Sequence, residues 1–400
     1  MASPKLRFKA FDGDWSLTSF QDLFTFKNGV NATKEQYGSG IKFINVLDII
    51  NNSNGITYDS IIGSVNITSK EIDKNLVQYG DVLFQRSSET REEVGQSNVY
   101  LSDEPVVFGG FVIRGSAQKE YDPVFMNGLL KTDSLRDQIT QLSGGSTRFN
   151  IGQDSLNKVS AYLPSKEEQT KIASFLSAVD EKISQLSQKY ALLSQYKQGM
   201  MQKLFNQQIR FKADDGSEFG GWVQKTIGET GDVITGKTPS TNNSNAWNGG
   251  ILFVTPTDMD GNKYQTTTIR SVANSHPKVL PQNAIMFTCI ASIGKISLSV
   301  KPCITNQQIN SIIVKKDHPE FIYYQLLNMV DYIKSTQANT TLPIINKTEF
   351  SKFILKIPQY SEQTKIANFL SSIDQKIDVV SEQLEQAKLW KKGLLQQMFV

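Results

Sequence analysis

The segment EQTKIASFLSAVDEKI at residues 168–183 returns as EQTKIANFLSSIDQKI at residues 362–377, and 12 of the 16 positions are identical. The two copies lie 194 residues apart, which is close to half of the 400-residue chain. The similarity continues forwards, where YKQGMMQKLF at 196–205 matches WKKGLLQQMF at 390–399. A weaker match opens each half, between RFKAFDGDW at 7–15 and RFKADDGSEFGGW at 210–222. Self-similarity over this length predicts an internal duplication rather than two unrelated domains.

Both copies of the repeated segment have the apolar spacing of a long helix. Apolar residues step alternately by four and three, which averages 3.5 residues per turn and is typical of a coiled-coil seam. The predicted coiled-coil interface consists of Ile172, Leu176, Val179, Ile183, Leu186, Tyr190, Ile366, Leu370, Ile373, Ile377, Val380 and Leu384. Ser165 and Glu168 have the spacing of a capping box, which predicts the start of the first helix just after Pro164.

The same apolar stripe extends towards the end of each predicted helix. It runs through Tyr196, Met200 and Leu204 in the first helix, and through Trp390, Leu394 and Met398 in the second. Before Tyr196 and before Trp390 a step of three follows a step of three, which predicts local overwinding. Each helix could pack against its own globular domain, but two helices of matched length and register are explained more simply by packing on each other. A pseudo-twofold relation between the halves requires that they run antiparallel.

The rest of the chain is of mixed α/β character. Residues 41–49, 81–85, 106–113, 250–256, 284–288 and 309–314 are predicted strands, and residues 123–140 and 319–335 are predicted helices. The expected fold class is α+β, with two mixed α/β domains, an antiparallel coiled coil and a pseudo-twofold internal repeat. The predicted boundaries are 1–164 for the first globular domain, 165–210 for the central helix, 211–358 for the second globular domain and 359–400 for the C-terminal helix.

Composition excludes several classes of protein. The chain is 39% hydrophobic and 20% charged, which is typical of a globular protein. No apolar run is long enough for a bilayer, and the N-terminal residues lack the apolar core of a secretory signal, so we expect a cytoplasmic protein. The only histidines are His276 and His318, and the only cysteines are Cys289 and Cys303. With so few ligands and nucleophiles, we expect no metal site and no catalytic residues in this chain.

One motif favours a different class of function. GDVITGKT at 231–238 matches the phosphate-loop pattern, in which Lys237 would hold the phosphates of a nucleotide. The pattern works only where a helix begins at the Gly-Lys-Thr, but Pro239 and a polar stretch follow instead. An NTPase that uses Lys237 therefore remains the alternative from another class. Asp180 and Lys182 resemble the acidic and lysine positions of a nuclease motif, but they lie inside the predicted helix, where a solvated helix face explains them better.

Polar side chains in the loops of both halves match those that read DNA bases. Arg and Lys bind guanine, whereas Asn and Gln bind adenine. The candidate DNA-binding residues are Lys27, Asn28, Lys34, Gln85, Arg86, Ser87, Arg91, Arg148, Asn150, Lys237, Thr238, Ser240, Asn242, Asn243, Lys295, Gln307, Gln308 and Asn346. Each one alone is explained as readily by an ordinary solvated loop. Their placement in both diverged halves is what favours recognition.

Charge argues against strong nucleic-acid binding by this chain alone. The net charge is only +3, and residues 1–164 carry 16 basic and 19 acidic residues. DNA binding would therefore depend on local patches, polar contacts or a partner that supplies phosphate contacts.

The order of segments resembles the DNA-specificity subunit of bacterial type I restriction–modification enzymes. The resemblance rests on the repeated EQTKIASFL and EQTKIANFL helices, each preceded by a proline, and it covers essentially the whole chain. ITGKTPSTNNSNAWNGGILFVTPTDM at 234–259, YGDVLFQ at 79–85 and KISQLSQKYALLSQYKQGMMQKLF at 182–205 support it. In this family Gly236 to Pro239 would open a recognition domain rather than a nucleotide loop.

The resemblance implies two target-recognition domains, at 1–164 and 211–358, joined by the two conserved helices. Each domain would read one half of a split DNA target, and the coiled coil would set the unread gap. Two methyltransferase subunits would dock on the chain, and translocase–nuclease subunits would complete the restriction complex. S-adenosylmethionine, ATP and magnesium would bind to those partners, and no cofactor to this chain. Within the same class, the alternative is the specificity subunit of a type II system with a fused methyltransferase–nuclease partner.

Overall fold

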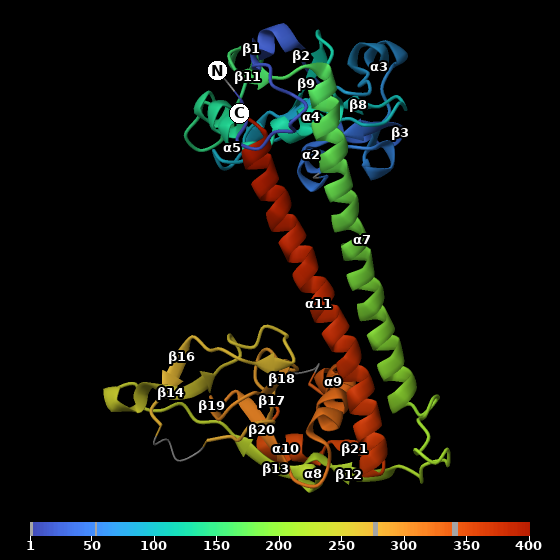
Figure 1. Cartoon of the computed structure of the whole chain (residues 1–400), viewed down its shortest axis with the longest axis vertical. Coiled ribbons are helices and arrows are strands. Elements are labelled where there is room, and N and C mark those ends of the chain that lie inside the picture. The colour runs from blue at the N-terminus through green and yellow to red at the C-terminus, as the bar shows by residue number, and fades with distance from the viewer. Residues whose placement is uncertain (1–2, 53, 275–278, 338–342) are drawn as a thin grey trace. The chain divides into compact units, whose positions relative to one another are not determined.

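The computed structural model describes residues 3–52, 54–274, 279–337 and 343–400. The chain divides into two compact units, each of which contains part of both long helices (Figure 1). Unit 1 comprises Met1–Gln188 and Ser381–Val400, and unit 2 comprises Lys189–Val380. Their mixture of helices and strands, the internal repeat and the paired long helices confirm the predicted fold class.

Unit 1 is built on a four-stranded sheet of order β2-β9-β5-β7 and a three-stranded sheet of order β4-β3-β8. Two further pairs, β1–β11 and β6–β10, are antiparallel. The strands are β1 (Ser16–Ser19), β2 (Phe24–Asn28), β3 (Tyr37–Ile44), β4 (Ser64–Val65), β5 (Val82–Gln85), β6 (Ser87–Ser88), β7 (Ser97–Val99), β8 (Val107–Phe108), β9 (Val112–Ala117), β10 (Phe149–Asn150) and β11 (Ser160–Leu163). The shorter helices are α1 (Phe20–Leu23), α2 (Val46–Asn51), α3 (Ser69–Asn75), α4 (Pro123–Leu129), α5 (Asp133–Gln141) and α6 (Gln153–Asn157).

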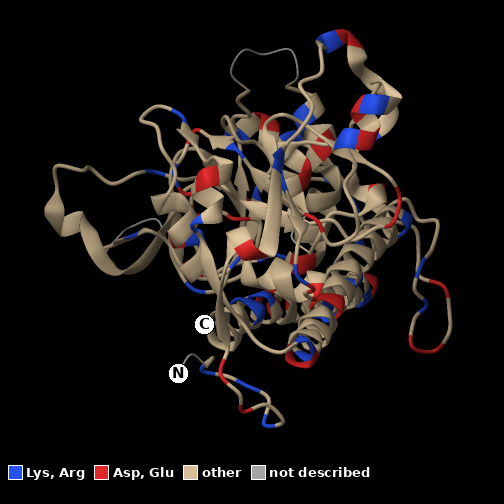
Figure 2. Ribbon diagram, turned by 90° about the horizontal axis from the view of Figure 1, so that it is seen from above, with Lys and Arg blue, Asp and Glu red and all other residues tan. Residues whose placement is uncertain are grey.

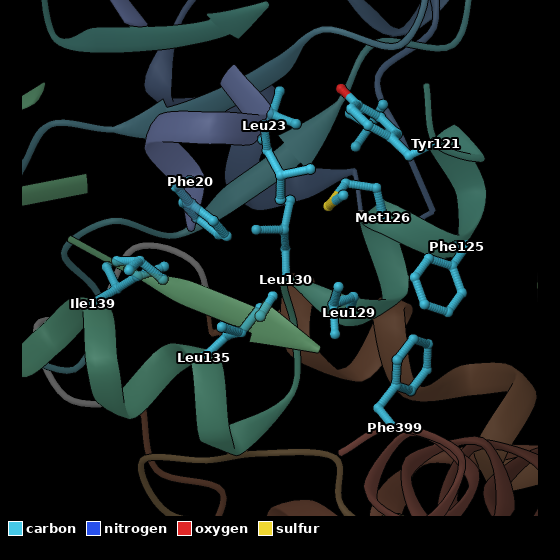
Figure 3. Packing of buried hydrophobic residues seen from close by; sticks show 14 of the residues in the cluster. Phe20, Leu23, Tyr121, Phe125, Met126, Leu129, Leu130, Leu135, Ile139 and Phe399 are labelled. Atoms are coloured by element: carbon cyan, nitrogen blue, oxygen red, sulfur yellow. The ribbon is translucent and has the colours of Figure 1, made fainter. Parts of the chain in front are cut away.

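The core of unit 1 joins the main sheet to the long helices. Figure 3 shows Phe20, Leu23, Leu129 and Leu130 converging, and Phe125 lying beside Phe399 of the C-terminal helix end. The Phe125 and Phe399 ring centroids are 5.1 Å apart. Burial of this apolar surface is the main source of stability for the unit.

Unit 2 repeats this plan with a five-stranded sheet of order β13-β20-β17-β18-β15 and a three-stranded sheet of order β16-β14-β19. An antiparallel β12–β21 pair completes it. The strands are β12 (Val223–Thr226), β13 (Gly231–Thr235), β14 (Trp247–Val254), β15 (Tyr264–Gln265), β16 (Arg270–Val272), β17 (Ile285–Thr288), β18 (Ile296–Ser299), β19 (Cys303–Thr305), β20 (Ile309–Val314) and β21 (Ile354–Ile357). The shorter helices are α8 (Ile227–Thr230), α9 (Pro319–Ser335) and α10 (Lys347–Lys352).

Several predicted elements match closely, and three do not, among them the strand predicted at 106–113, which a turn divides into β8 and β9. The strand at 309–314 and the helix at 319–335 have the predicted bounds. The predicted strand at 41–49 is wrong in its second half, because the chain turns into α2, where the Asp48 carboxylate accepts a hydrogen bond from the Asn45 backbone N–H. The predicted helix at 123–140 is divided into α4 and α5 by a break at Leu130–Thr132.

The two long helices are α7 (Lys166–Phe205) and α11 (Tyr360–Met398). Within each unit a segment of α7 lies antiparallel to a segment of α11 (Figure 1). The capping box at Ser165 is only half formed. The Ser165 hydroxyl accepts a weak hydrogen bond from the Glu168 N–H, at 3.4 Å. The Glu168 carboxylate binds Arg7 instead of returning to the cap, since a charged partner forms the stronger bond.

Most of the predicted seam is buried. Ile172, Leu176, Val179, Leu186, Ile366, Leu370, Ile373 and Val380 are buried, and Ile183, Ile377 and Leu384 are partly buried. Tyr190 is 39% exposed and lines a cavity with Ile377 and Asp374. The seam is therefore apolar on both sides of a more polar stretch at this tyrosine.

The predicted continuation of the stripe is wrong at Tyr196, which is 51% exposed, whereas Trp390, although 54% exposed, packs edge-on against Phe175 of α7 with ring centroids 5.9 Å apart. Met201 is buried, whereas Met200 is only partly buried. The inward positions next to the two aromatics belong to Lys197 and Lys391. Each lysine forms an ion pair with an aspartate on the other helix, so a charge is tolerated where the pattern of apolar residues predicted an aromatic ring.

Candidate nucleic-acid interface

In unit 1 the short β6–β10 pair brings two distant loops together. Ser87 lies opposite Asn150, and its hydroxyl donates to the Asn150 side-chain oxygen. The Ile151 N–H donates to the Arg86 carbonyl at 3.0 Å. Arg86, Arg148 and Asn150 are exposed and Ser87 partly so. The pair therefore places two guanidinium groups and an amide at one edge of the unit, which we call edge 1.

Arg91 and Gln85 lie beside this edge in different ways. The Arg91 guanidinium stacks over the Phe149 ring at 5.1 Å from its centroid, which restrains an otherwise exposed cation. Gln85 is buried, and its side-chain N–H donates to the Ser87 carbonyl at 2.9 Å. Gln85 thus supports the loop from inside rather than presenting an amide to a ligand.

The remaining candidates in unit 1 lie nearer its β2 strand. The Lys27 ammonium donates to the Lys74 carbonyl, and burial beside Arg114 lowers its pKa. Asn28 is exposed at the end of β2 and pairs with Ile113. Lys34 is exposed in a 3-10 turn at Lys34–Gln36. The structure shows no contact that brings Lys34 to Arg86 among the described residues.

In unit 2 the place that corresponds to the β6–β10 pair holds the Ile290–Ile344 bridge, and polar residues gather instead where the chain beyond β13 meets the turn before β20. The Lys237 N–H donates to the Thr305 carbonyl at 2.9 Å, and its side chain is exposed. The Thr238 hydroxyl donates to the Gln307 side-chain oxygen at 2.8 Å, and the Asn306 amide donates to Gln308 at 2.9 Å. Lys237, Thr238 and the two glutamines thus gather at one edge, which we call edge 2.

Other unit 2 candidates have local structural roles. The Asn346 side chain caps α10 by accepting from the Glu349 N–H at 3.0 Å. The Asn243 side chain accepts from the Asn245 N–H at 3.2 Å, and the Lys295 ammonium donates to the Pro256 carbonyl at 2.7 Å. Ser240 and Asn242 are exposed, and the Ser240 carbonyl accepts from the Trp247 ring N–H at 3.1 Å. Such caps and loop bonds compete with DNA contact for the same side chains.

The geometry at Gly236 rules out a phosphate loop. Residues 236–243 form no helix, so no helix N-terminus is directed at a nucleotide. A side chain at Gly236 would meet the Asn306 and Thr305 carbonyl oxygens at 2.2 and 2.3 Å. Gly29 of unit 1 approaches the Phe108 and Gly109 carbonyls in the same way, at 2.3 and 2.4 Å. The glycine in each half therefore permits close strand contact, which accounts for the motif without an NTPase.

Both edges share a four-residue turn that sequence reasoning overlooked. In unit 1 the Val112 N–H donates to the Gly109 carbonyl at 2.9 Å, and in unit 2 the Ile309 N–H donates to the Asn306 carbonyl at 3.2 Å. The turns thus place Phe111 and Gln308 at the same position. Gly109-Gly110 between two apolar runs is a turn signal, and the prediction of one continuous strand from 106 to 113 is wrong because it ignores this signal.

Charge is distributed rather than concentrated. Figure 2 shows Lys and Arg interspersed with Asp and Glu along the ribbon. Within the described residues, no group of three or more His, Cys, Asp or Glu side chains could hold a metal ion. Basic and acidic positions thus alternate along the chain in this view, without a long run of basic residues alone.

The starts of the two long helices are held by matching ion pairs. The Arg7 guanidinium binds Glu168 through two hydrogen bonds of 2.7 Å, and Arg210 binds Glu362 through bonds of 3.0 and 2.7 Å. Glu168 is 2% exposed and Glu362 is fully buried. The pairing with Glu168 raises the pKa of Arg7. Each arginine comes from the segment that opens its half of the repeat.

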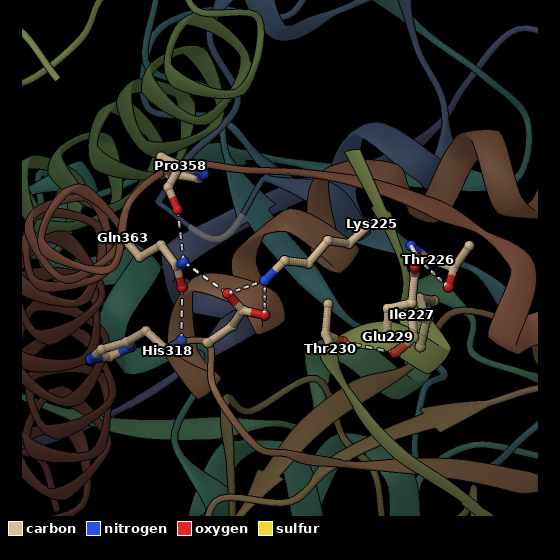
Figure 4. Close-up of polar contacts among 9 residues, drawn as sticks. Lys225, Thr226, Ile227, Glu229, Thr230, His318, Pro358 and Gln363 are labelled. Carbon is tan, nitrogen blue, oxygen red and sulfur yellow. Dashed lines mark hydrogen bonds and ion pairs between the residues drawn. The ribbon is translucent and has the colours of Figure 1, made fainter. Parts of the chain in front are cut away.

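A glutamine at each helix start makes the same contacts in both units. In unit 2 the Gln363 amide donates to the Pro358 carbonyl and to Asp317, and its oxygen accepts from the His318 N–H (Figure 4). Lys225 completes this network by pairing with Asp317 at 3.0 Å. In unit 1, Gln169 binds the Pro164 carbonyl and the Asp122 N–H. The duplicated sequence thus encodes duplicated contacts.

The chain is similar in sequence to known proteins of one family. The sequence profile described as type I restriction modification DNA specificity domain matches residues 12–195 and again residues 220–389. The chain belongs to this family. Its function is DNA recognition for a type I restriction–modification system, and neither the NTPase nor the type II alternative is favoured.

Individual members of the family are similar over different lengths. The putative type I restriction enzyme MjaX specificity subunit of Methanocaldococcus jannaschii is 23% identical and covers 96% of this chain and 92% of the relative. The HindI specificity subunit of Haemophilus influenzae is 35% identical over 34% of this chain and 32% of its own. The crystal structure of a type I system S subunit from M. genitalium superposes with a TM-score of 0.61 at 17% identity, covering 100% and 99% of the two chains. The last similarity supports the fold alone.

The family match covers parts of both units and both long helices. A search of the helices in the described part of the chain found none with the length and apolar character that crossing a membrane requires.

Proposed function

We propose that each unit of this specificity subunit reads one half of a bipartite DNA target through its edge, and that the two long helices set the gap between the halves. The observation that carries the proposal is a contrast inside the repeat. The helix contacts of Glu168 and Gln169 recur at Glu362 and Gln363, whereas the residues exposed at edge 1 and edge 2 differ. A fixed scaffold with diverged surfaces is suited to two different half-sites.

The chemistry of edge 1 supports contact with the major groove. Arg86 and Arg148 offer fork-shaped donors that match the O6 and N7 atoms of guanine, and Asn150 offers the donor and acceptor pair that matches adenine. The stacked Arg91 is more suited to a phosphate, because its guanidinium is already restrained by the Phe149 ring. Edge 2 would read its half-site with Thr238 and Gln307, and Lys237 would neutralise a phosphate.

The partners follow from what the chain lacks. We propose that it carries no catalytic residue and binds no cofactor, so that methyltransferase subunits docked on the helices supply S-adenosylmethionine chemistry. Translocase–nuclease subunits would supply the ATP- and magnesium-dependent steps, all in the cytoplasm. Residues 1–164 are net acidic, which favours phosphate contacts made by the methyltransferases and weak DNA binding by this chain alone.

The test is to map methylated adenines in DNA exposed to the complex of this chain with its methyltransferase subunits. The expected result is one bipartite target with a constant gap. Replacing Arg86 by Ala should relax positions in one half-site only, and replacing Gln307 by Ala should relax positions in the other. A complex that shows no preference between random duplexes at moderate salt would reject the proposal.

A further inference from the structure

An exposed aromatic side chain lies on the turn that contacts Arg86 of edge 1. Phe111 is 65% exposed, although burial of a phenylalanine side chain contributes about 1.5–3 kcal/mol to stability. Its backbone carbonyl accepts from the Arg86 N–H at 2.9 Å, and the neighbouring Gly110 carbonyl accepts from the Arg86 guanidinium at 3.4 Å. The ring therefore lies next to the guanidinium-bearing loop that we propose binds DNA.

The turn that carries Phe111 packs closely against neighbouring parts of unit 1. A Cβ atom at Gly109 would meet the Phe43 ring at 2.9 Å, and one at Gly110 would meet the Asn31 side-chain oxygen at 1.9 Å. The Gly110 N–H donates to the Val30 carbonyl at 2.8 Å, which ties the turn to the chain beyond β2. A larger residue at either glycine would displace one of these side chains, so the two glycines favour the close packing of the turn that carries this exposed apolar ring. The ring position is determined by the fold rather than by a mobile loop.

The equivalent turn in unit 2 shows that this position varies in chemistry but not in geometry. Gln308 occupies it, partly buried, and its side-chain oxygen accepts from Asn306. The residue at this turn is polar in one half and aromatic in the other, while the closing hydrogen bond is retained. Such variation at a fixed place is expected of a residue that contacts a variable part of a ligand.

We infer that Phe111 reads a thymine in the half-site of unit 1 by packing against its C5-methyl group in the major groove. The inference rests on the proposed function of edge 1 and adds an apolar specificity determinant to it. An apolar side chain is complementary to the thymine methyl, which is the only apolar group that the bases display in that groove. Arg86 beside it would anchor the turn on a neighbouring guanine or phosphate.

The experiment uses the complex of the full chain with its methyltransferase subunits and duplexes that carry the mapped target. Each thymine of the unit 1 half-site, on either strand, is replaced in turn by deoxyuridine, which removes only the methyl group. For the wild type, one replacement should weaken binding about fourfold, the value expected for one buried methyl group. The Phe111→Ala variant should bind the thymine duplex at least fourfold more weakly and should no longer distinguish it from the deoxyuridine duplex at that position.

Two variants serve as controls. Phe111→Leu keeps an apolar contact and should retain part of the discrimination. Leu17→Ala removes a side chain of similar exposure, 61%, on β1 outside the edge, and should leave binding unchanged. The inference is overturned if no thymine replacement affects the wild type, if Phe111→Ala keeps full sensitivity to deoxyuridine, or if the unit 1 half-site contains no A·T pair. Failure of the wild-type complex to prefer its mapped target would instead reject the proposed function.

Discussion

Unit 1 and unit 2 agree where they hold the long helices and differ at edge 1 and edge 2. In both, an arginine from the opening segment pairs with a buried glutamate, and a lysine pairs with an aspartate across the helices at 2.5 Å. At the edges, Arg86 and Phe111 of unit 1 stand where Cys289 and Gln308 stand in unit 2. Buried charges restrict substitution because an unpaired partner is costly, whereas exposed loop residues change at little cost to stability.

The two units also differ in the polarity around the lysine–aspartate pair. In unit 2, Asp374 also accepts from the Tyr324 hydroxyl, and Lys263 binds Tyr324 and Ser371. In unit 1 the Lys391 ammonium, besides pairing with Asp180, donates to Asn54 at 2.9 Å. The same pair is therefore embedded in a larger network in unit 2. The lysine–aspartate pair is thus common to both units, whereas the contacts of Lys263 and Tyr324 are particular to unit 2.

The largest effect is expected from breaking the matched arginine–glutamate pairs. Arg7→Ala and Arg210→Ala should each lower the free energy of unfolding by about 3 kcal/mol, because each leaves a buried carboxylate without its cation. Denaturant unfolding of each variant measures this, with Lys388→Ala as an exposed control. Equal losses would support one shared scaffold. A loss of unfolding free energy below about 1 kcal/mol in either variant would show that the ion pair does not stabilise the helix start equally in the two units.

A second, somewhat smaller effect should follow from placing charges in the seam. Ile183 and Ile377 are partly buried and equivalent in the repeat, and Asp at either position should cost about 2 kcal/mol. The complex of the double variant with methyltransferase subunits should also methylate targets with altered or variable gaps, since the helices would pair less firmly. Thermal unfolding and methylation mapping measure the two outcomes. An unchanged gap together with unchanged stability would contradict the role of the seam.

A third prediction concerns the edges rather than the scaffold. Arg86→Ala should weaken binding of the assembled complex by about 1–3 kcal/mol and relax one position, if the side chain contacts a base. Cys289 stands at the corresponding place in unit 2, and Cys289→Ala should leave recognition unchanged because its thiol is buried. Competition binding with single-base variants of the target measures both. Loss of affinity that is uniform across all variants would identify Arg86 as a phosphate contact instead.

The smallest effect should be a pH-dependent contribution of Lys131 to the free energy of unfolding. Burial beside Lys391 lowers its pKa to about 8, whereas Leu327 stands at the equivalent distance after the helix-starting proline of unit 2. Below pH 8, Lys131 is charged in both the folded and the unfolded state. The folded state then carries the full free-energy cost of burying this charge. As pH rises from about 8 towards the unfolded value of about 10.4, the cost falls because the folded state binds fewer protons than the unfolded state.

Lys131→Leu should therefore stabilise the chain by about 1 kcal/mol at pH 7 and by less at pH 10. Thermal unfolding of the wild type and the variant across pH 7–10 measures the narrowing difference. Leu327→Ala, which tests packing without charge, should show a loss that does not change with pH. A Lys131→Leu effect that is equally constant would mean that the lysine does not titrate in this range.

Some elements of the fold were predictable from the sequence, and others were not. The repeat, the bounds of α9 and β20 and most of the seam were predictable because periodicity reports directly on burial. The strand prediction at 41–49 failed after Asn45, where a side-chain hydrogen bond from Asp48 starts a helix that apolar spacing could not reveal. The prediction at Tyr196 failed for a related reason. Periodicity favours an aromatic ring in the seam, but the ion pair of Lys197 takes that place.

The sequence suggested residue types for a candidate site, and that assignment stays a prediction, but it did not give their arrangement. Arg86, Arg148 and Asn150 were named from residue type alone, and only the β6–β10 pair brings them together. Asn346 and Asn243 were named on the same grounds, yet their side chains cap local structure. Residue type limits what a side chain can bind, but it does not reveal which partner is near.

The sequence alone therefore determined the duplication and the two long helices, because these depend on identity and spacing along the chain. Tertiary structure alone decided which loops share an edge, which lysines enter the helix seam and why Phe111 stands at the surface. Those outcomes depend on contacts between residues far apart in sequence. Close approach at Gly109 and Gly110, and charge pairing across two helices, are properties of the folded chain and leave no periodic signal in its sequence.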